Sequence, residues 1–131
     1  MANQTQKLHI AMLPWPAFGH MIPFLDLPKN IAQKGHRVSY LATPRNIQRL
    51  PKLPPYLADS ITLVQLLLHN DNGLPENAEA TMDIPPHNML DLKRAYHGLQ
   101  EDVLLSSSKI LLQIGLFMTY LLTGYPQLLL I

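Results

Sequence analysis

The feature that most constrains this chain is a change of hydrophobic period within residues 7–43. Residues 8–13 are apolar at nearly every position, which predicts a strand buried on both faces. From His20 onward, apolar residues recur three or four apart and predict a helix that closes with a lysine and a glycine. Residues 37–42 predict a second strand. Because such crossovers are right-handed, the two strands are expected to be parallel neighbours in an α/β fold.

One residue conflicts with a regular first helix. Pro28 has no amide to donate to the carbonyl of Phe24, at a cost of about 3 kcal/mol in an otherwise regular helix. A kink at Pro28, or an early end of the helix, is therefore expected.

The loop between the first strand and the helix predicts where a ligand would bind. In an open parallel sheet, ligands bind beyond the carboxyl ends of the strands, where loops meet helix N-termini. Residues 14–20, PWPAFGH, occupy that position. The positive end of the helix dipole disfavours the protonated imidazole of His20, so this side chain is a candidate general base. The position of His20 in the sequence is equally consistent with a histidine that only begins the helix and takes no part in catalysis.

Composition excludes several classes of function. A net charge of +1 without a long basic run argues against nucleic acid as the main partner. The absence of cysteine excludes a disulfide framework, and the six histidines lack the paired spacing of zinc ligands. The polar start MANQTQK lacks the apolar core of a signal peptide, which favours a cytoplasmic location. At 131 residues, one small domain is expected.

Four further segments follow the βαβ unit. Thr43 and Pro44 are suited to the N-cap and the first position of a short helix. Residues 61–68 predict a third parallel strand, and residues 69–86 a long mobile loop. Residues 86–105 predict a helix with one apolar stripe, expected to pack in the core. The stripe consists of Met89, Leu92, Tyr96, Leu99 and Val103.

The tail, residues 110–131, contains no charged side chain. A mostly apolar stretch of this length is enough for a membrane span, so a small membrane-anchored protein is one alternative. Glutamine, threonine, glycine and proline within the tail weaken that alternative, as does the absence of a basic cluster after it.

Residues 9–50, HIAMLPWPAFGHMIPFLDLPKNIAQKGHRVSYLATPRNIQRL, resemble the amino-terminus of plant UDP-sugar glycosyltransferases. The most similar members add rhamnose or glucose to flavonoid or triterpenoid acceptors or their glycosides. The resemblance continues through ITLVQLLL, GLPENAEATMDIP and LKRAYHGLQEDV, over about four-fifths of the chain. Its most specific motif is the P-x-P-x-x-G-H loop, followed by the Gly-His turn into the second strand.

This resemblance implies a partial Rossmann-like parallel sheet, the amino-terminal half-domain of a two-domain GT-B glycosyltransferase. Residues 1–109 would form the partial acceptor-side domain and residues 110–131 an aberrant tail, with the carboxyl-terminal donor domain absent. The 131-residue chain is therefore expected to be inactive as a transferase. A non-catalytic remnant that binds the acceptor is the further alternative.

The resemblance also implies roles for individual residues. His20 would take the proton from an acceptor hydroxyl, whose oxygen would attack the anomeric carbon of the sugar as UDP leaves, with inversion. Trp15, Phe18 and Met89 would line the acceptor side, and Gly19 would let the backbone approach the donor phosphates. The partners would be a small-molecule acceptor and a UDP-sugar co-substrate, with no metal and no other cofactor.

A shifted reading frame would reconcile the tail with this family. The family has a strand of the Trp-Ile-Ile-Tyr-Asp type in this region, and its aspartate orients the catalytic histidine. Translating residues 113–131 from the third base of each codon permits such a sequence, and the codons of Met118 and Thr119 then force an aspartate. We hypothesise a frameshifted and truncated product, which sequencing the transcript across codons 105–115 would test.

Overall fold

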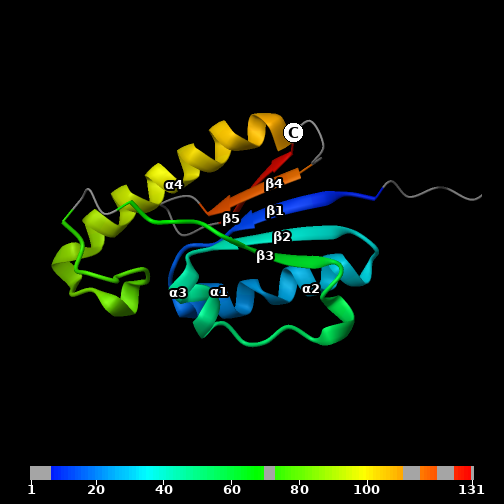
Figure 1. The fold of residues 1–131 in the computed structure, drawn as a ribbon, viewed down its shortest axis with the longest axis horizontal. Coiled ribbons are helices and arrows are strands. Elements are labelled where there is room, and N and C mark those ends of the chain that lie inside the picture. The colour runs from blue at the N-terminus through cyan, green and yellow to red at the C-terminus, as the bar shows by residue number, and fades with distance from the viewer. Residues whose placement is uncertain (1–6, 70–72, 111–115, 121–125, 131) are drawn as a thin grey trace, which may run out of the picture.

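A five-stranded sheet forms the centre of the computed structural model, which describes residues 7–69, 73–110, 116–120 and 126–130 (Figure 1). The strand order is β3-β2-β1-β4-β5. Neighbouring strands are parallel except for β4 and β5, which are antiparallel. The strands are β1 (His9–Leu13), β2 (Arg37–Ala42), β3 (Ile61–Gln65), β4 (Leu116–Tyr120) and β5 (Pro126–Leu130).

Helices cover both faces of this sheet. Figure 1 shows α1, α2 and α3 on one face and α4 on the other. The helices are α1 (Phe18–Phe24), α2 (Asp26–Gln33), α3 (Pro44–Arg49) and α4 (Met89–Ile110). Short 3-10 turns are η1 (Pro55–Leu57), η2 (Thr81–Asp83) and η3 (Pro86–Asn88). The layered arrangement confirms the predicted α/β class.

Strand β1 is buried on both sides, as its sequence predicts. Ile10 and Met12 pack in the core cluster shared with α1 and α2, whereas Ala11 and Leu13 pack against α4. Successive side chains of a strand point to opposite faces of the sheet. A strand that is apolar at nearly every position therefore contributes to the core on both faces. The predicted parallel pairing of β1 with β2 is confirmed.

The first predicted helix is two helices. The first helix ends at Phe24 and the next begins at Asp26, so the expected early end of the helix is confirmed and the alternative, a kink at Pro28, is not observed. Pro28 lies in the first turn of α2, where backbone amides have no partner inside the helix in any case. The missing donor is thus accommodated by ending one helix and starting another before the proline.

The start of α3 agrees with the sequence only in part. Thr43 occupies the N-cap and Pro44 the first helical position, as predicted. The Thr43 side chain makes no capping hydrogen bond, however, and its buried hydroxyl has no partner among the described residues. The helix begins here because proline already has the backbone angle that the first position requires.

The segment after β3 makes more contacts than its sequence predicts. The strand ends at Gln65 instead of residue 68. Residues 73–86 are mostly loop, as expected, but they include η2 and form hydrogen bonds with α3 and with the loop after β1. Two of the three core clusters include apolar residues of the segment from 66 to 84.

The tail contributes strands to the sheet. β4 pairs parallel with β1, in the region where the family resemblance predicts a strand, and β5 pairs antiparallel with β4. Among the described residues, no helix combines the length and the apolar character that crossing a membrane requires. Residues 111–115, 121–125 and 131 lie outside the described part of the chain, so the membrane-anchor alternative is untested there.

Candidate active-site edge

The carboxyl ends of the parallel strands place three segments at one edge of the sheet. The loop of residues 14–17 follows β1, α3 follows β2, and residues 66–69 and 73–88 follow β3. A backbone hydrogen bond of 2.9 Å from the Thr81 amide to the Pro16 carbonyl joins the first and third of these segments. The predicted position of a ligand site is therefore built from segments far apart in the sequence.

His20 lies in the first turn of α1. Ala17 is the N-cap, and the His20 amide donates to its carbonyl at 2.8 Å. The imidazole is solvent-exposed at this edge. Gly19 is exposed as well, and a Cβ added there would meet no atom within 4 Å. The exposed His20 side chain and the bare backbone of Gly19 are thus both accessible from solvent at this edge.

Trp15 lies on the α4 face of the sheet. Its ring packs edge-to-face on Tyr96, with centroids 5.4 Å apart and planes at 78°. The Tyr96 hydroxyl donates to the carbonyl of Pro14, which fixes the loop against α4. Burial raises the pKa of Tyr96, so the phenol remains a hydrogen-bond donor at neutral pH.

Phe18 lies on the opposite face. It packs against the core beneath α1 and α2, and the Arg49 guanidinium lies 5.7 Å from its ring centroid. Trp15 and Phe18 therefore pack in different clusters and do not form one wall. Met89, the third predicted acceptor residue, is half-buried at the start of α4.

An open groove of about 630 Å³ lies between α3 and the segment after β3. Its lining combines apolar side chains with four polar ones. The residues are Pro44, Arg45, Gln48, Leu67, Leu68, Leu74, Pro75, Asn77, Ala78 and Glu79. Leu68, Leu74 and Ala78 also belong to the cluster that Trp15 packs against, so the groove adjoins the loop of residues 14–17. The family resemblance implies an acceptor pocket near residues 69–86, but sequence reasoning singled out none of the lining residues, although the strand-end rule that located His20 applies equally to the loops after β2 and β3.

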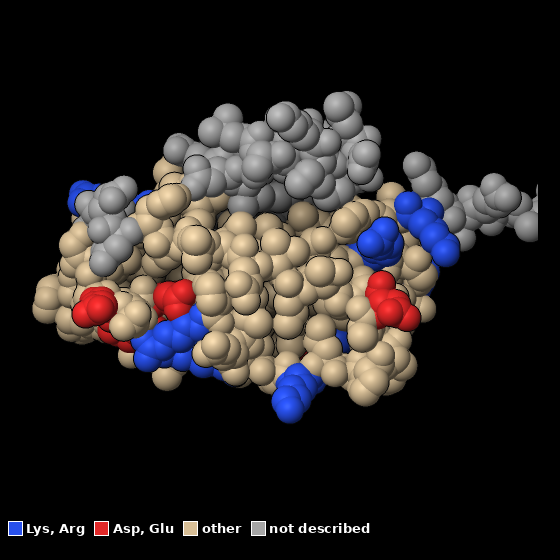
Figure 2. All heavy atoms as spheres, in the orientation of Figure 1, with Lys and Arg blue, Asp and Glu red and all other residues tan. Residues whose placement is uncertain are grey.

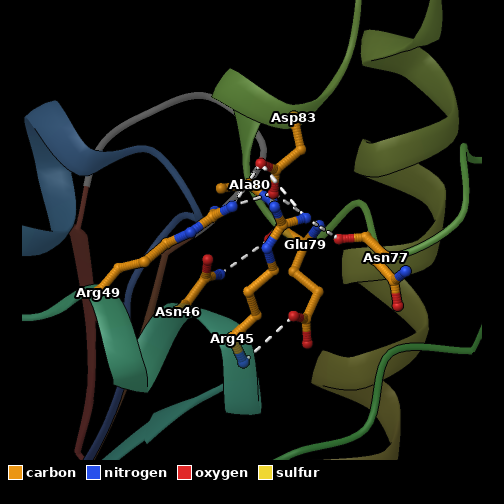
Figure 3. A network of polar contacts seen from close by, with 7 residues as sticks. All are labelled: Arg45, Asn46, Arg49, Asn77, Glu79, Ala80 and Asp83. Atoms are coloured by element: carbon orange, nitrogen blue, oxygen red, sulfur yellow. Dashed lines mark hydrogen bonds and ion pairs between the residues drawn. The ribbon is translucent and has the colours of Figure 1, made fainter.

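A polar network ties the segment after β3 to α3 (Figure 3). The two terminal nitrogens of the Arg49 guanidinium, Nη2 and Nη1, donate to the two carboxylate oxygens of Asp83 at 2.6 and 2.9 Å. The Asn46 amide donates to the carbonyl of Glu79 at 2.8 Å, and the Arg45 backbone amide donates to the Glu79 carboxylate at 3.1 Å. Arg49 and Asp83 are 34 positions apart, so no local pattern could have predicted the pair.

This pair makes stability depend on pH. Burial opposes ionisation of Asp83, but the Arg49 hydrogen bonds, the backbone amides of Glu79 and Ala80 and the Arg49 charge together outweigh it and lower the pKa of Asp83. The carboxylate therefore stabilises the fold fully above the ordinary carboxyl pKa of about 4. That contribution disappears as pH falls through the lower pKa of the folded state.

We expect the wild-type advantage over Asp83→Asn to shrink between about pH 5 and pH 3. Urea unfolding of both proteins across this range measures it. The exposed pair of Asp26 and Lys29, at 3.3 Å, supplies the control variant Asp26→Asn, whose stability difference should stay small throughout. A constant gap between wild type and Asp83→Asn would contradict the assignment.

On the face that Figure 2 shows, the described residues form no large patch of either positive or negative charge. Acidic and basic side chains are interspersed there among uncharged ones, unlike the basic stripe typical of nucleic-acid binding. Within the described part of the chain, no group of three or more His, Asp or Glu side chains could hold a metal ion.

Curated plant enzymes are similar to this chain in sequence. Soyasaponin III rhamnosyltransferase of Glycine max is 52% identical over 98 residues, which are 75% of this chain and 21% of that enzyme. UDP-glycosyltransferase 91A1 of Arabidopsis thaliana is 55% identical over 107 residues, 79% of this chain and 23% of that enzyme. The chain thus spans about a fifth of the length of these relatives. No family model matches it.

Solved structures show the same fold. Glycyrrhiza uralensis UGT73P12, complexed with glycyrrhetinic acid 3-O-monoglucuronide, matches with a TM-score of 0.71 and 21% identity over 87% of this chain and 24% of that one. Arabidopsis thaliana UGT89C1, complexed with UDP-L-rhamnose, matches with a TM-score of 0.65 and 25% identity over 80% of this chain and 27% of that one. By sequence and fold, the chain belongs to the plant UDP-glycosyltransferases and matches the amino-terminal portion of their GT-B structure.

Proposed function

We propose that this chain is the acceptor-side part of an inverting UDP-sugar glycosyltransferase, with His20 as the general base. The observation that carries the proposal is the exposed imidazole in the first turn of α1, at the carboxyl edge of a parallel sheet. This is the edge at which open α/β sheets bind their ligands. The sequence similarity to plant sugar transferases supports the same reaction class.

The reaction needs one proton transfer and one displacement. His20 accepts the proton of an acceptor hydroxyl as the oxygen forms a bond to the anomeric carbon. The bond between that carbon and the UDP oxygen breaks, and UDP leaves with the electron pair. Attack from the side opposite UDP inverts the configuration. The imidazole becomes a cation as it takes up this proton.

The acceptor we propose is a flavonoid or a triterpenoid, or a glycoside of one, and the sugar is rhamnose or glucose. The name of the Glycine max relative describes a rhamnosyltransferase acting on a soyasaponin. UGT89C1 was solved with UDP-L-rhamnose and also with quercetin, which supports a nucleotide sugar and a phenolic acceptor as the two classes of ligand.

The groove beside Trp15 suits such an acceptor. Leu67, Leu68 and Leu74 offer apolar surface to a ring system, while Arg45 and Gln48 offer donors to hydroxyl groups. We propose that the acceptor lies in this groove, with Gly19 next to the donor phosphates. Since the chain spans about a fifth of its relatives' length, we expect the 131 residues to bind an acceptor without transferring sugar to it.

Fluorescence of Trp15, the single tryptophan, tests this proposal. We expect saturable quenching when the chain is titrated with quercetin, and no glycosylated product after addition of UDP-rhamnose or UDP-glucose. Leu67→Ala should weaken binding about tenfold, because a leucine side chain covered by a ligand contributes ~1–2 kcal/mol.

Leu90→Ala is the matched control. Leu67 and Leu90 are both exposed, at 74% and 56%, but Leu90 does not line the groove. Its variant should bind quercetin as the wild type does. Quenching that never saturates, or equal affinities for wild type and Leu67→Ala, would refute the acceptor assignment.

A further inference from the structure

A single carboxylate organises the segment after β3. The Asp83 carboxylate accepts hydrogen bonds from both terminal guanidinium nitrogens of Arg49. One of its oxygens also accepts hydrogen bonds from the backbone amides of Glu79 and Ala80, at 3.1 and 3.0 Å (Figure 3). Its side chain is 8% exposed and that of Arg49 is 23% exposed. A carboxylate with this many charge-assisted donors fixes the backbone of η2 relative to α3.

The segment after β3 and α3 each make one contact with the start of α1 and the residue before its N-cap, residues 16–18. The amide of Thr81, which lies between Ala80 and Asp83, donates to the Pro16 carbonyl at 2.9 Å. Arg49 approaches the ring of Phe18, the first residue of α1, at 5.7 Å from its centroid. The two contacts lie on either side of Ala17, the N-cap of α1.

These contacts form a closed ring. It runs from Pro16 through Thr81 to Asp83, from Asp83 to Arg49, from Arg49 to Phe18, and back along the chain to Pro16. Such a ring restricts the relative positions of its residues, because none of them can move alone without breaking a contact. His20 follows Phe18 by two residues in the same helical turn, so the ring holds the stretch of backbone from which the imidazole projects.

We propose that Arg49 and Asp83 are positioning residues that hold the first turn of α1, and with it His20, through this ring. The inference rests on the proposed role of His20 as the base and names the residues that orient it. Both act through that turn and not on a substrate. A guanidinium is required because only its planar fork meets both carboxylate oxygens while its face remains near the Phe18 ring.

Two variants test the ring in the 131-residue chain. In Asp83→Asn the charge is lost, and in Arg49→Lys the charge stays but the fork is lost. We expect the His20 imidazole resonances to move from their wild-type positions in ¹H–¹⁵N spectra, and the emission of Trp15 to shift. Arg49→Lys should give the smaller change. Spectra are compared at temperatures where circular dichroism shows every variant folded.

Asp26→Asn is the matched control, since it also removes an ion-paired carboxylate but on α2 and outside the ring. It should leave the His20 resonances and the Trp15 emission unchanged. A loss of stability alone would move neither signal in a folded sample. Wild-type positions of the His20 resonances in folded Asp83→Asn would overturn the proposal.

If Asp83→Asn does not fold, amide hydrogen exchange of the wild-type protein still tests whether the ring exists. The amides of Thr81 and His20 belong to different segments, and the ring predicts that they become exposed in one opening event. Their exchange rates should therefore show the same dependence on low concentrations of urea. Different dependences would show that the two segments open independently and would overturn the ring.

Quercetin affinity separates this inference from the proposed function. If the wild type binds quercetin, Asp83→Asn should weaken binding about tenfold, through the loop that carries Trp15. If the wild type does not bind it, the acceptor assignment fails, while the imidazole spectra and the exchange data still decide whether the ring exists.

Discussion

Replacing His20 with alanine lowers the turnover number about 10²- to 10⁴-fold in an enzyme that contains both halves of the cleft, the range typical of a lost general base. The test enzyme is a chimera in which this chain supplies the 98 residues that match soyasaponin III rhamnosyltransferase. We expect the KM for the acceptor to change little, because the imidazole acts mainly while the proton moves. Product formation from UDP-rhamnose, followed by liquid chromatography, measures both constants.

His87→Ala controls for the loss of any imidazole. His87 is exposed in η3 and is not proposed to touch the reacting atoms. The variant should keep the turnover number of the chimera. If His20→Ala also keeps it, His20 is not the base. A chimera that is inactive even with His20 present would instead show that the two sequences do not form one cleft.

Replacing Leu92 with alanine should lower the free energy of unfolding by about 3 kcal/mol, within the range for buried leucines. Leu92 is fully buried and packs with Leu74, Ala78 and Ala95 under the segment after β3. The lost methyl groups leave a cavity at the point where α4 supports the groove. Urea unfolding monitored by circular dichroism measures the loss, and a change of this size is a large part of a small domain's stability.

Leu90→Ala is the control on the same helix. Leu90 is 56% exposed, so truncating it removes little buried surface, and the expected change is below about 0.5 kcal/mol. Comparable losses for the two variants would mean that α4 does not pack as described. A large effect confined to Leu92 would confirm the predicted core stripe of this helix.

Local patterns were enough for most of the fold. The continuous apolar run in residues 8–13 predicted a strand, and the spacing after His20 predicted helical structure. The second strand, β2, was predicted with its observed bounds. The stripe of α4 was also correct for Leu92, Tyr96 and Leu99, which are buried. Such patterns are readable because burial on one face imposes a period on neighbouring residues.

The exceptions have local causes that the pattern did not resolve. A proline inside a helix can be accommodated by a kink or by a break, and the structure shows the break, at Leu25. A threonine before a proline predicts a cap, yet the side chain of Thr43 does not cap α3. In both cases the local sequence allows two geometries, and the structure shows which of them is adopted.

The sequence by itself determined the strand–helix–strand order of residues 8–42, the parallel pairing of β1 with β2, and the place of His20 at the start of a helix. Only the tertiary structure decided that Trp15 and Phe18 pack on opposite faces, that residues 73–86 dock on α3, and that Arg49 meets Asp83. The physical reason is the separation in sequence of the residues that interact. A period or a turn is a property of adjacent residues, whereas a salt bridge across 34 positions exists only after the strands have paired and brought their ends together.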